Sequence, residues 1–84
     1  MTFKKYLLKC RLLVLNTPNY IHSEYKRSKD LYQKDIKGFH KRYIKLITKL
    51  DKSKKFKVIL IGFDGTKKIE LDKIYTKKIF EIID

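Results

Sequence analysis

Few side chains in this 84-residue sequence could do nucleophilic, acid–base or metal chemistry, and they are scattered along the chain. Cys10 is the single cysteine, so no disulfide can form within one chain. The histidines His22 and His40 have no Cys, Asp or Glu cluster at metal-ligand spacing. The carboxylates form no pair suited to acid–base work, and Asp64 is better explained by a turn. The sequence therefore predicts no catalytic, cofactor-binding or metal-binding residue.

The formal net charge of +13 is uneven, because residues 1–57 contain 17 Lys and Arg against 4 Asp and Glu. Such a field attracts phosphate groups and acidic surfaces. Lysines make up 19 of the 22 basic residues, and lysine lacks the planar fork with which arginine grips phosphates and bases. The charge alone therefore predicts nonspecific attraction, and a solvated lysine-rich surface is the simpler interpretation.

The pattern of apolar residues predicts four strands and two helices. The strands cover residues 11–16, 43–50, 56–63 and 66–71. Asp64-Gly65 is typical of a hairpin turn between the last two strands. One apolar stripe indicates a long helix over residues 24–41, with Ser23 as its N-cap and Gly38 weakening its last turn. A second helix follows Asp72, which can cap it, so the element order is β-α-β-β-β-α.

Two strands contain uninterrupted hydrocarbon runs, Leu12-Leu13-Val14-Leu15 and Val58-Ile59-Leu60-Ile61. A strand that is apolar on both faces is typical of the middle of a sheet, whereas Lys45 and Lys49 on the second strand are typical of an edge. A spatial order of 1-2-3-4 would place the first run at an edge, so we favour 2-1-3-4. The first β-α-β unit is then a right-handed parallel crossover, and the linker 51–55 crosses the end of the first strand. This α/β arrangement is a thioredoxin-like mixed four-stranded sheet, without the helix that commonly lies between strands 2 and 3.

The missing helix predicts that one face of the sheet is uncovered, because thioredoxin-like sheets have their first and last helices on the other face. Either Leu12 and Val14 or Leu13 and Leu15 should then lie bare, with counterparts from the third strand. Monomers rarely leave such a patch in water, so we expect a homodimer or another protein to bury it. The interface residues are predicted from both hydrocarbon runs: Leu12, Leu13, Val14, Leu15, Val58, Ile59, Leu60 and Ile61.

A second candidate is an anion site at one end of the same sheet. The turn after the first strand, the N-terminus of the long helix and the lysine-rich loop 52–55 should meet there. A helix N-terminus beside ammonium groups can bind an anion. The residues predicted for this site are Thr17, Asn19, Lys52, Lys54 and Lys55. The alternative is a solvated lysine loop.

Several stretches of the chain resemble one known family. They are the basic-then-aliphatic strand from Leu8 to Pro18, Gly38-Phe39-His40-Lys41-Arg42-Tyr43-Ile44, Val58-Ile59-Leu60-Ile61-Gly62-Phe63-Asp64-Gly65 and Ile79-Phe80-Glu81-Ile82-Ile83-Asp84. Together they resemble the peroxiredoxin-like domain of unknown function called P-DUDES, in a shortened form. Phe63 departs from that family, which has lysine there. The resemblance implies a single thioredoxin-like domain of unknown function over residues 1–84.

The position where thioredoxin-like enzymes carry their reactive thiol has no cysteine in this chain. Such enzymes need a thiolate at the end of the first strand, beside a helix N-terminus that lowers its pKa. That position reads Asn16-Thr17-Pro18-Asn19, Cys10 lies at the opposite end of the strand, and no proline precedes Phe56. We therefore expect a non-enzymatic module that acts through protein association. The alternative is a basic module that binds nucleic acid or other polyanions through its lysines.

No targeting or membrane-spanning segment is expected. Lys4, Lys5, Lys9 and Arg11 break up the first residues, which argues against a secretory signal. The apolar run over residues 12–15 is far too short to span a membrane. The family contains exported members, yet the sequence does not indicate a compartment for this chain.

Overall fold

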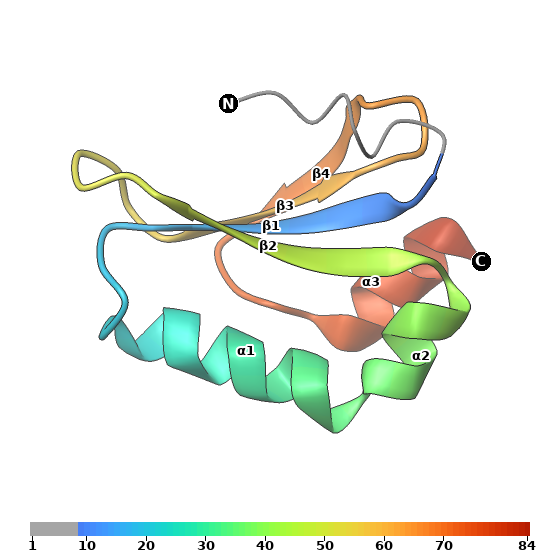
Figure 1. Cartoon of the computed structure of the whole chain (residues 1–84), viewed down its shortest axis with the longest axis horizontal. Coiled ribbons are helices and arrows are strands. Elements are labelled where there is room, and N and C mark those ends of the chain that lie inside the picture. The colour runs from blue at the N-terminus through green and yellow to red at the C-terminus, as the bar shows by residue number, and fades with distance from the viewer. Residues whose placement is uncertain (1–8) are drawn as a thin grey trace.

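The computed structural model describes residues 9–84, which form a sheet with helices packed against it (Figure 1). In chain order the elements are β1 (Arg11–Thr17), α1 (Ser23–Lys34), α2 (Ile36–Lys41), β2 (Ile44–Leu50), β3 (Lys57–Ile61), β4 (Lys67–Leu71) and α3 (Thr76–Ile83). Lys4 and Lys5, which argue against a secretory signal, and Leu8 at the start of the family resemblance lie outside the described residues. Among residues 9–84, every helix is too short or too polar to span a lipid bilayer.

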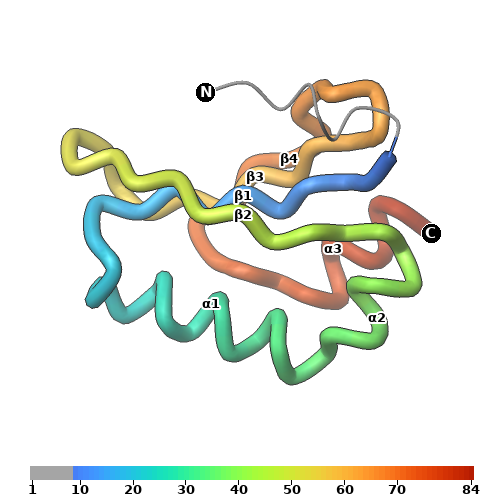
Figure 2. The backbone as a smooth tube through the Cα atoms, in the orientation of Figure 1, coloured from blue at the N-terminus to red at the C-terminus, as the bar shows by residue number. Residues whose placement is uncertain are grey.

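The predicted strand order is confirmed. Residues 9–84 form one four-stranded sheet in the order β2-β1-β3-β4. β1 pairs with β2 in parallel, where Val14 is opposite Ile47, and with β3 in antiparallel, where Val14 is opposite Ile59. The linker between β2 and β3 runs past the end of β1, as Figure 2 shows, and the Asp51 N–H donates to the Thr17 carbonyl at 2.9 Å. Both hydrocarbon runs therefore lie in the middle of the sheet.

The three helices of residues 9–84 all lie on one face of the sheet, where they cover the main core (Figure 1). Leu13 and Leu15 of β1 face this layer and are fully buried. Phe39 of α2 sits between Tyr32 of α1 and Phe80 of α3, with ring centroids 4.7 Å and 4.9 Å away. Aromatic pairs at this spacing add to the stabilisation from apolar burial, so the three helices share one packed centre.

The single helix predicted over residues 24–41 is wrong, because the chain breaks it at Asp35. Asp35 has φ −120° and ψ 39°, which separates α1 from the six-residue α2. The apolar stripe continues across the break, so the spacing of Tyr32, Ile36 and Phe39 could not show it. The break turns α2 toward α3, and Phe39 consequently reaches the core.

Both predicted N-caps are also corrected. Ser23 is the first residue of α1, and His22 precedes it as the N-cap, with its Nδ1 accepting the Glu24 N–H at 3.3 Å. Imidazole nitrogen here replaces the hydroxyl or carboxyl oxygen that usually caps a helix. Asp72 does not cap α3, because Tyr75 occupies that position and its hydroxyl donates to Asp72 Oδ1 at 3.4 Å.

Gly38 has a packing role that its low helix propensity does not reveal. A Cβ at this position would lie 3.0 Å from the Phe80 ring and 2.9 Å from Asp35 Oδ1. Such a ring contact is tighter than most Cβ contacts in real proteins, so the Phe80 ring would have to move slightly to admit it. Glycine therefore allows α2 to lie directly against α3.

Candidate functional site

The face of the sheet opposite the helices is the candidate site, and we call it the open face. Side chains alternate along a strand, so Leu12, Val14 and Asn16 of β1 point to the open face while Leu13 and Leu15 point to the helices. The strand register places a residue of β2 and one of β3 beside each of them. The open face therefore has three rows across its centre: Lys45, Leu12 and Ile61; Ile47, Val14 and Ile59; and Lys49, Asn16 and Lys57.

The apolar centre of the open face comprises Leu12, Val14, Ile47, Ile59 and Ile61. Leu12 is 1 % exposed, Val14 is 3 % exposed and Ile61 is 9 % exposed, whereas Ile47 and Ile59 are half-buried. The prediction that this patch lies bare is therefore wrong for the first three. Ile47 and Ile59 flank Val14 on both sides and pack, with Cys10, against the buried residues. Ile47 and Ile59 are thus the members of the apolar centre with the most exposed surface on the open face.

The other four predicted interface residues lie on the helix side of the sheet. Leu13, Leu15, Val58 and Leu60 are buried in the main core with Phe39 and Ile79. They cannot contact a partner while the helices are in place. Of the eight predicted interface residues, only Leu12, Val14, Ile59 and Ile61 lie on the open face, and among these Ile59 retains the most exposed surface.

Beside the apolar centre, at the end of β1, a hollow of about 480 Å³ is lined mainly by basic side chains. We call it the lysine hollow; its polar lining residues are Asn16, Lys49, Lys54, Lys55, Lys57 and Glu70. Lys49 and Lys57 flank Asn16 from β2 and β3, and Lys54 and Lys55 come from the linker that crosses the end of β1. Four ammonium groups against one carboxylate make this hollow electropositive.

The anion site predicted from the sequence is only partly assembled. Lys54 and Lys55 line the lysine hollow, but Lys52 does not. Thr17 is 0 % exposed and its hydroxyl donates to the Asn19 carbonyl at 2.7 Å, so it cannot contact an ion. The Asn19 side chain accepts the Ile21 N–H at 3.1 Å. Alternation along β1 explains the correction, because it turns Thr17 toward the helices and its neighbour toward the open face.

Asn16 is the site residue that the sequence analysis missed. Asparagine is frequent in turns, which places the end of the predicted first strand at Asn16, whereas β1 continues to Thr17. The side chain is 7 % exposed, and its Oδ1 has no hydrogen-bond partner in the structure described. Buried polar atoms are nearly always paired, because an unpaired one costs free energy. The spacing of Asn16 from Leu12 and Val14 could have placed it on the same face.

Comparison with known proteins supports the fold alone. The sequence matches no protein-family model and none of the curated proteins with which it was compared. The structure is similar to the crystal structure of a reduced 2-Cys peroxiredoxin from Plasmodium vivax, with a TM-score of 0.76 and 12 % sequence identity. The match covers 99 % of this chain and 80 % of that chain. The chain has a thioredoxin-like fold.

Cys10 lies away from the place where thioredoxin-like enzymes carry a reactive thiol. It precedes β1, whereas the turn between β1 and α1 follows Thr17 at the other end of that strand. Cys10 is half-buried and lines a hollow of about 280 Å³ together with Tyr32 and His40. The Tyr32 hydroxyl donates to the Ile44 carbonyl at 2.7 Å, and burial raises the pKa of this phenol. In residues 9–84 no group of three His, Cys, Asp or Glu side chains could hold a metal ion.

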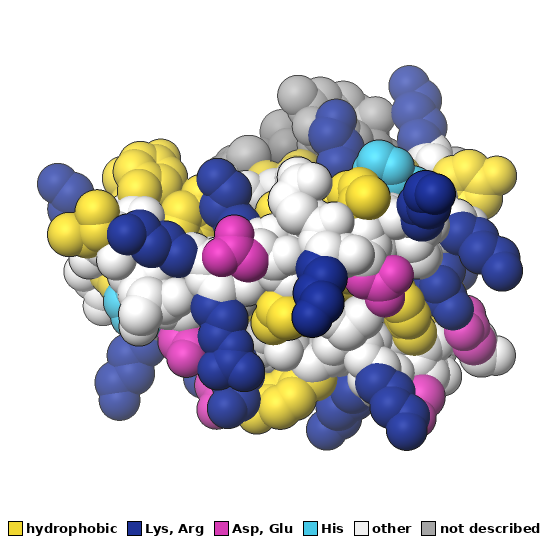
Figure 3. Space-filling model, turned by 90° about the horizontal axis from the view of Figure 1, so that it is seen from below, with side chains coloured by type: hydrophobic (Ala, Val, Ile, Leu, Met, Phe, Trp, Pro, Cys, Tyr) yellow, Lys and Arg dark blue, Asp and Glu magenta, His cyan; other side chains and the backbone are white. Residues whose placement is uncertain are grey.

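The helix side of the molecule carries its charge diffusely. Figure 3 shows this side, where Lys and Arg side chains are spread around the whole face with Asp and Glu between them. α1 alone presents Lys26, Arg27 and Lys29 together with Asp30. This arrangement favours the generic attraction predicted from composition over a single nucleic-acid groove on that side.

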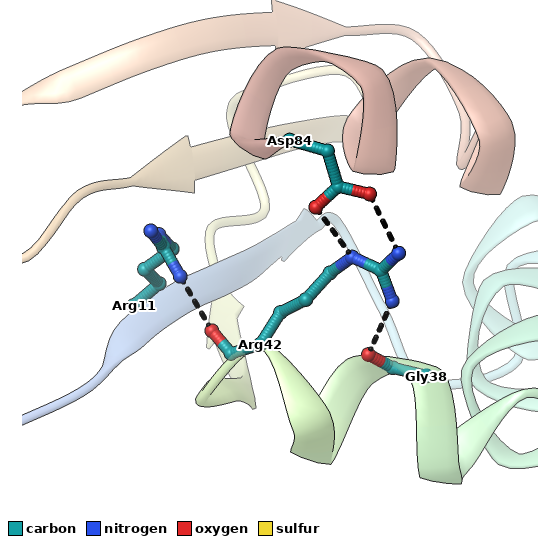
Figure 4. Close-up of polar contacts among 4 residues, drawn as sticks. All are labelled: Arg11, Gly38, Arg42 and Asp84. Atoms are coloured by element: carbon teal, nitrogen blue, oxygen red, sulfur yellow. Dashed lines mark hydrogen bonds and ion pairs between the residues drawn. The ribbon is translucent and has the colours of Figure 1, made fainter.

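Arg42 joins the end of α2 to the end of α3, as Figure 4 shows. Its Nη2 and Nε donate to the two carboxylate oxygens of Asp84 at 2.7 Å and 3.0 Å, and its Nη1 donates to the Gly38 carbonyl at 2.9 Å. The guanidinium also lies 3.8 Å from the Phe80 ring centroid. Arg11 extends the network from β1, because its Nη1 donates to the Arg42 carbonyl at 2.7 Å. These contacts connect β1, α2 and α3 at this end of the molecule.

Proposed function

We propose that this chain is a non-enzymatic thioredoxin-like interaction module that binds another protein through the open face of its sheet. The observation that carries the proposal is the one-sided helix layer, since no helix of residues 9–84 lies over the open face (Figure 1). Ile47 and Ile59 offer partly exposed apolar surface on a rigid central sheet. A sheet face with an apolar centre and a charged rim is typical of a protein-binding surface.

The charge around the apolar centre favours an acidic partner over a second copy of the chain. Lys45, Lys49 and Lys57 border the centre on the open face, and Glu70 of β4 lines the same hollow as Lys49 and Lys57. A twofold dimer through this face would bring the lysines of one protomer close to the lysines of the other. Like charges across an interface oppose association. We therefore propose a partner whose apolar surface is surrounded by Asp and Glu side chains.

The absence of redox activity is part of the same proposal. The peroxiredoxin that the fold matches is named for two cysteines, whereas this chain has only Cys10, before β1. Turnover of a peroxide or a disulfide that is abolished by Cys10→Ser would overturn this part of the proposal. We expect no turnover above that of the buffer.

We also propose that the chain is a member of the P-DUDES group without a helix between β2 and β3. The motif residues that carry this resemblance have structural roles, since Gly38 allows the close approach of α2 to α3 and accepts a hydrogen bond from Arg42. Ile44, the last residue of the same motif, begins β2 and is buried. These roles explain why such residues could persist in a protein without a catalytic site.

Two matched surface variants test the proposed interface. Ile47→Glu places a carboxylate on the open face, whereas Ile21→Glu makes the same change at a residue that is 78 % exposed in the turn before α1. We expect an acidic protein to be retained by the wild type and by Ile21→Glu but lost with Ile47→Glu. Equal retention by both variants would contradict the proposal. A concentration-dependent dimer in sedimentation experiments that Ile47→Glu abolishes would replace the acidic partner with a second copy.

The alternative function, binding of nucleic acid or other polyanions, is separated by titration with DNA, RNA and heparin at several salt concentrations. Binding that disappears near physiological salt reflects generic lysine charge alone. Tight binding that survives at that salt concentration would favour the alternative over the protein partner.

A further inference from the structure

The lysine hollow combines two features that together indicate a ligand. Lys49, Lys54, Lys55 and Lys57 surround it with positive charge, and Asn16 at its base has a buried Oδ1 without a partner in the structure described. Ammonium groups provide strong, charge-assisted hydrogen bonds to anions. An unpaired carbonyl oxygen instead requires a hydrogen-bond donor. An anion that carries its own donor would satisfy both features at once.

The lysine hollow is held in place by the sheet and by a hydrogen-bonded turn in the linker between β2 and β3. Asn16 lies between Lys49 of β2 and Lys57 of β3 in the strand register, so three neighbouring strands hold the base of the site. The Asp51 side chain fixes the start of the linker, because its Oδ1 accepts the N–H and the hydroxyl of Ser53 at 3.1 Å and 2.7 Å. Lys54 and Lys55 follow directly on this fixed turn.

We infer that the lysine hollow binds a phosphate group that carries a hydroxyl donor, with the lysines contacting the anionic oxygens and Asn16 Oδ1 accepting the hydroxyl hydrogen. Two sources share this chemistry: hydrogen phosphate, in which one oxygen is protonated, and a phosphate ester whose carbon chain bears a hydroxyl group. Sulfate has a similar shape and charge but no proton at neutral pH. Methyl phosphate is mostly the doubly charged anion above about pH 7, and it has no hydroxyl group either.

Calorimetric titrations of the full chain with four anions at equal ionic strength test this inference. Phosphate and glycerol 3-phosphate should bind saturably and at least about tenfold more tightly than sulfate and methyl phosphate, because the latter pair leaves Asn16 Oδ1 unpaired. Glycerol 3-phosphate binding more tightly than phosphate would identify the ester as the source, and the reverse order would identify the free ion. Equal affinity for phosphate and sulfate, or no saturable binding of any of the four, would overturn the inference.

Variants locate the site. Asn16→Leu should remove the preference for phosphate over sulfate without unfolding the chain, because an apolar residue of similar size replaces a buried unpaired group. Lys54→Gln with Lys55→Gln should weaken phosphate binding at least about fivefold. The matched control is Lys26→Gln with Lys37→Gln, two exposed lysines on the helix side, which makes the same change in net charge. An equal loss in the control pair would show that generic charge, and not the hollow, binds phosphate.

This inference and the proposed protein interface can fail separately. Ile47→Glu disrupts the apolar centre, and Ile47 does not line the lysine hollow. The Lys54 and Lys55 variant leaves the apolar centre unchanged. Loss of phosphate binding with the protein partner retained would leave the proposed function standing, and the converse result would leave the phosphate site standing.

Discussion

Arg42 and Asp84 form a two-point ion pair that closes the helix layer at one end of the molecule. The two guanidinium nitrogens donate to both carboxylate oxygens, at 2.7 Å and 3.0 Å. These hydrogen bonds lower the pKa of the Asp84 carboxyl below its usual value of 3.8 and raise the pKa of Arg42. The pair connects α2 to α3 over 42 residues of sequence. The ion pair is therefore a long-range tertiary contact and not a contact within one helix.

The pH dependence of stability should reveal this pair. Because the pKa of Asp84 is lowered in the folded state, its contribution is present above about pH 4, the ordinary carboxyl range, and is lost as the pH falls through the lowered value. We expect Asp84→Asn to reduce the free energy of unfolding at pH 7 and to have little effect at pH 2, as measured by urea denaturation. Asp72→Asn, at an exposed carboxylate that receives only the weak Tyr75 contact, is the control. A loss for Asp84→Asn that is equal at both pH values would contradict this assignment.

Gly38→Ala should destabilise the chain although it raises helix propensity. Alanine is favoured over glycine in a helix by about 1 kcal/mol. The new Cβ would lie 3.0 Å from the Phe80 ring, and such overpacking costs about 1–3 kcal/mol. We therefore expect a net loss in the free energy of unfolding. In a Phe80→Leu background the same change should become neutral or stabilising, and persistence of the loss there would rule out the contact with Phe80 as its cause.

Conservative truncations compare the burial of the open face with that of the helix side. Ile61→Val on the open face and Ile79→Val in the main core should each reduce the free energy of unfolding by about 0.5–1.5 kcal/mol. Ile82→Val, at a partly exposed residue of α3, should change it by less than about 0.5 kcal/mol. Urea denaturation of the three variants measures these differences. If Ile61→Val reduces the free energy of unfolding as little as Ile82→Val does, Ile61 on the open face is exposed and not buried.

Asp64 should titrate far below an ordinary carboxylate. Its Oδ1 accepts the N–H and hydroxyl of Thr66 at 3.0 Å and 2.8 Å, and Lys68 lies 3.1 Å from Oδ2. These contacts lower the pKa of Asp64 from 3.8 to about 2, with the Thr66 hydrogen bonds as the main cause. Its contribution to stability is therefore present above about pH 4 and is lost as the pH falls toward 2. NMR titration of the carboxyl carbon should give a midpoint near 2, and Thr66→Val should raise it. A midpoint near 4 in the wild type would show that the turn does not form as described.

The sheet order could be predicted from the sequence because a few residue types decide it. The two hydrocarbon runs require burial on both faces, whereas the lysines on the second strand suit an edge of the sheet. Together they predict the strand order 2-1-3-4, which the structure confirms. The helix break at Asp35 could not be predicted, since the apolar stripe continues through Tyr32, Ile36 and Phe39. A backbone turn of this kind depends on tertiary packing against α3, which periodicity does not record.

The candidate site was harder to predict than the fold. The alternation of side chains shows which residues of β1 share a face, but it does not show that Leu12 and Val14 are buried on that face. The preference of asparagine for turns suggests that the strand ends at Asn16, whereas the alternation with Leu12 and Val14 places Asn16 on the open face. The strand register resolved both points, because it identifies the neighbours on either side of β1.

The most direct test of the account is a photo-crosslinking comparison of the open face with a matched surface position. A photoreactive amino acid replaces Ile47 in one variant and Ile21 in the other, and covalent products are identified by mass spectrometry. We predict a product between position 47 and a second, acidic protein that position 21 does not give. Products that are the same at both positions, or position 47 reacting with nothing, would contradict the claim that the open face is the binding surface.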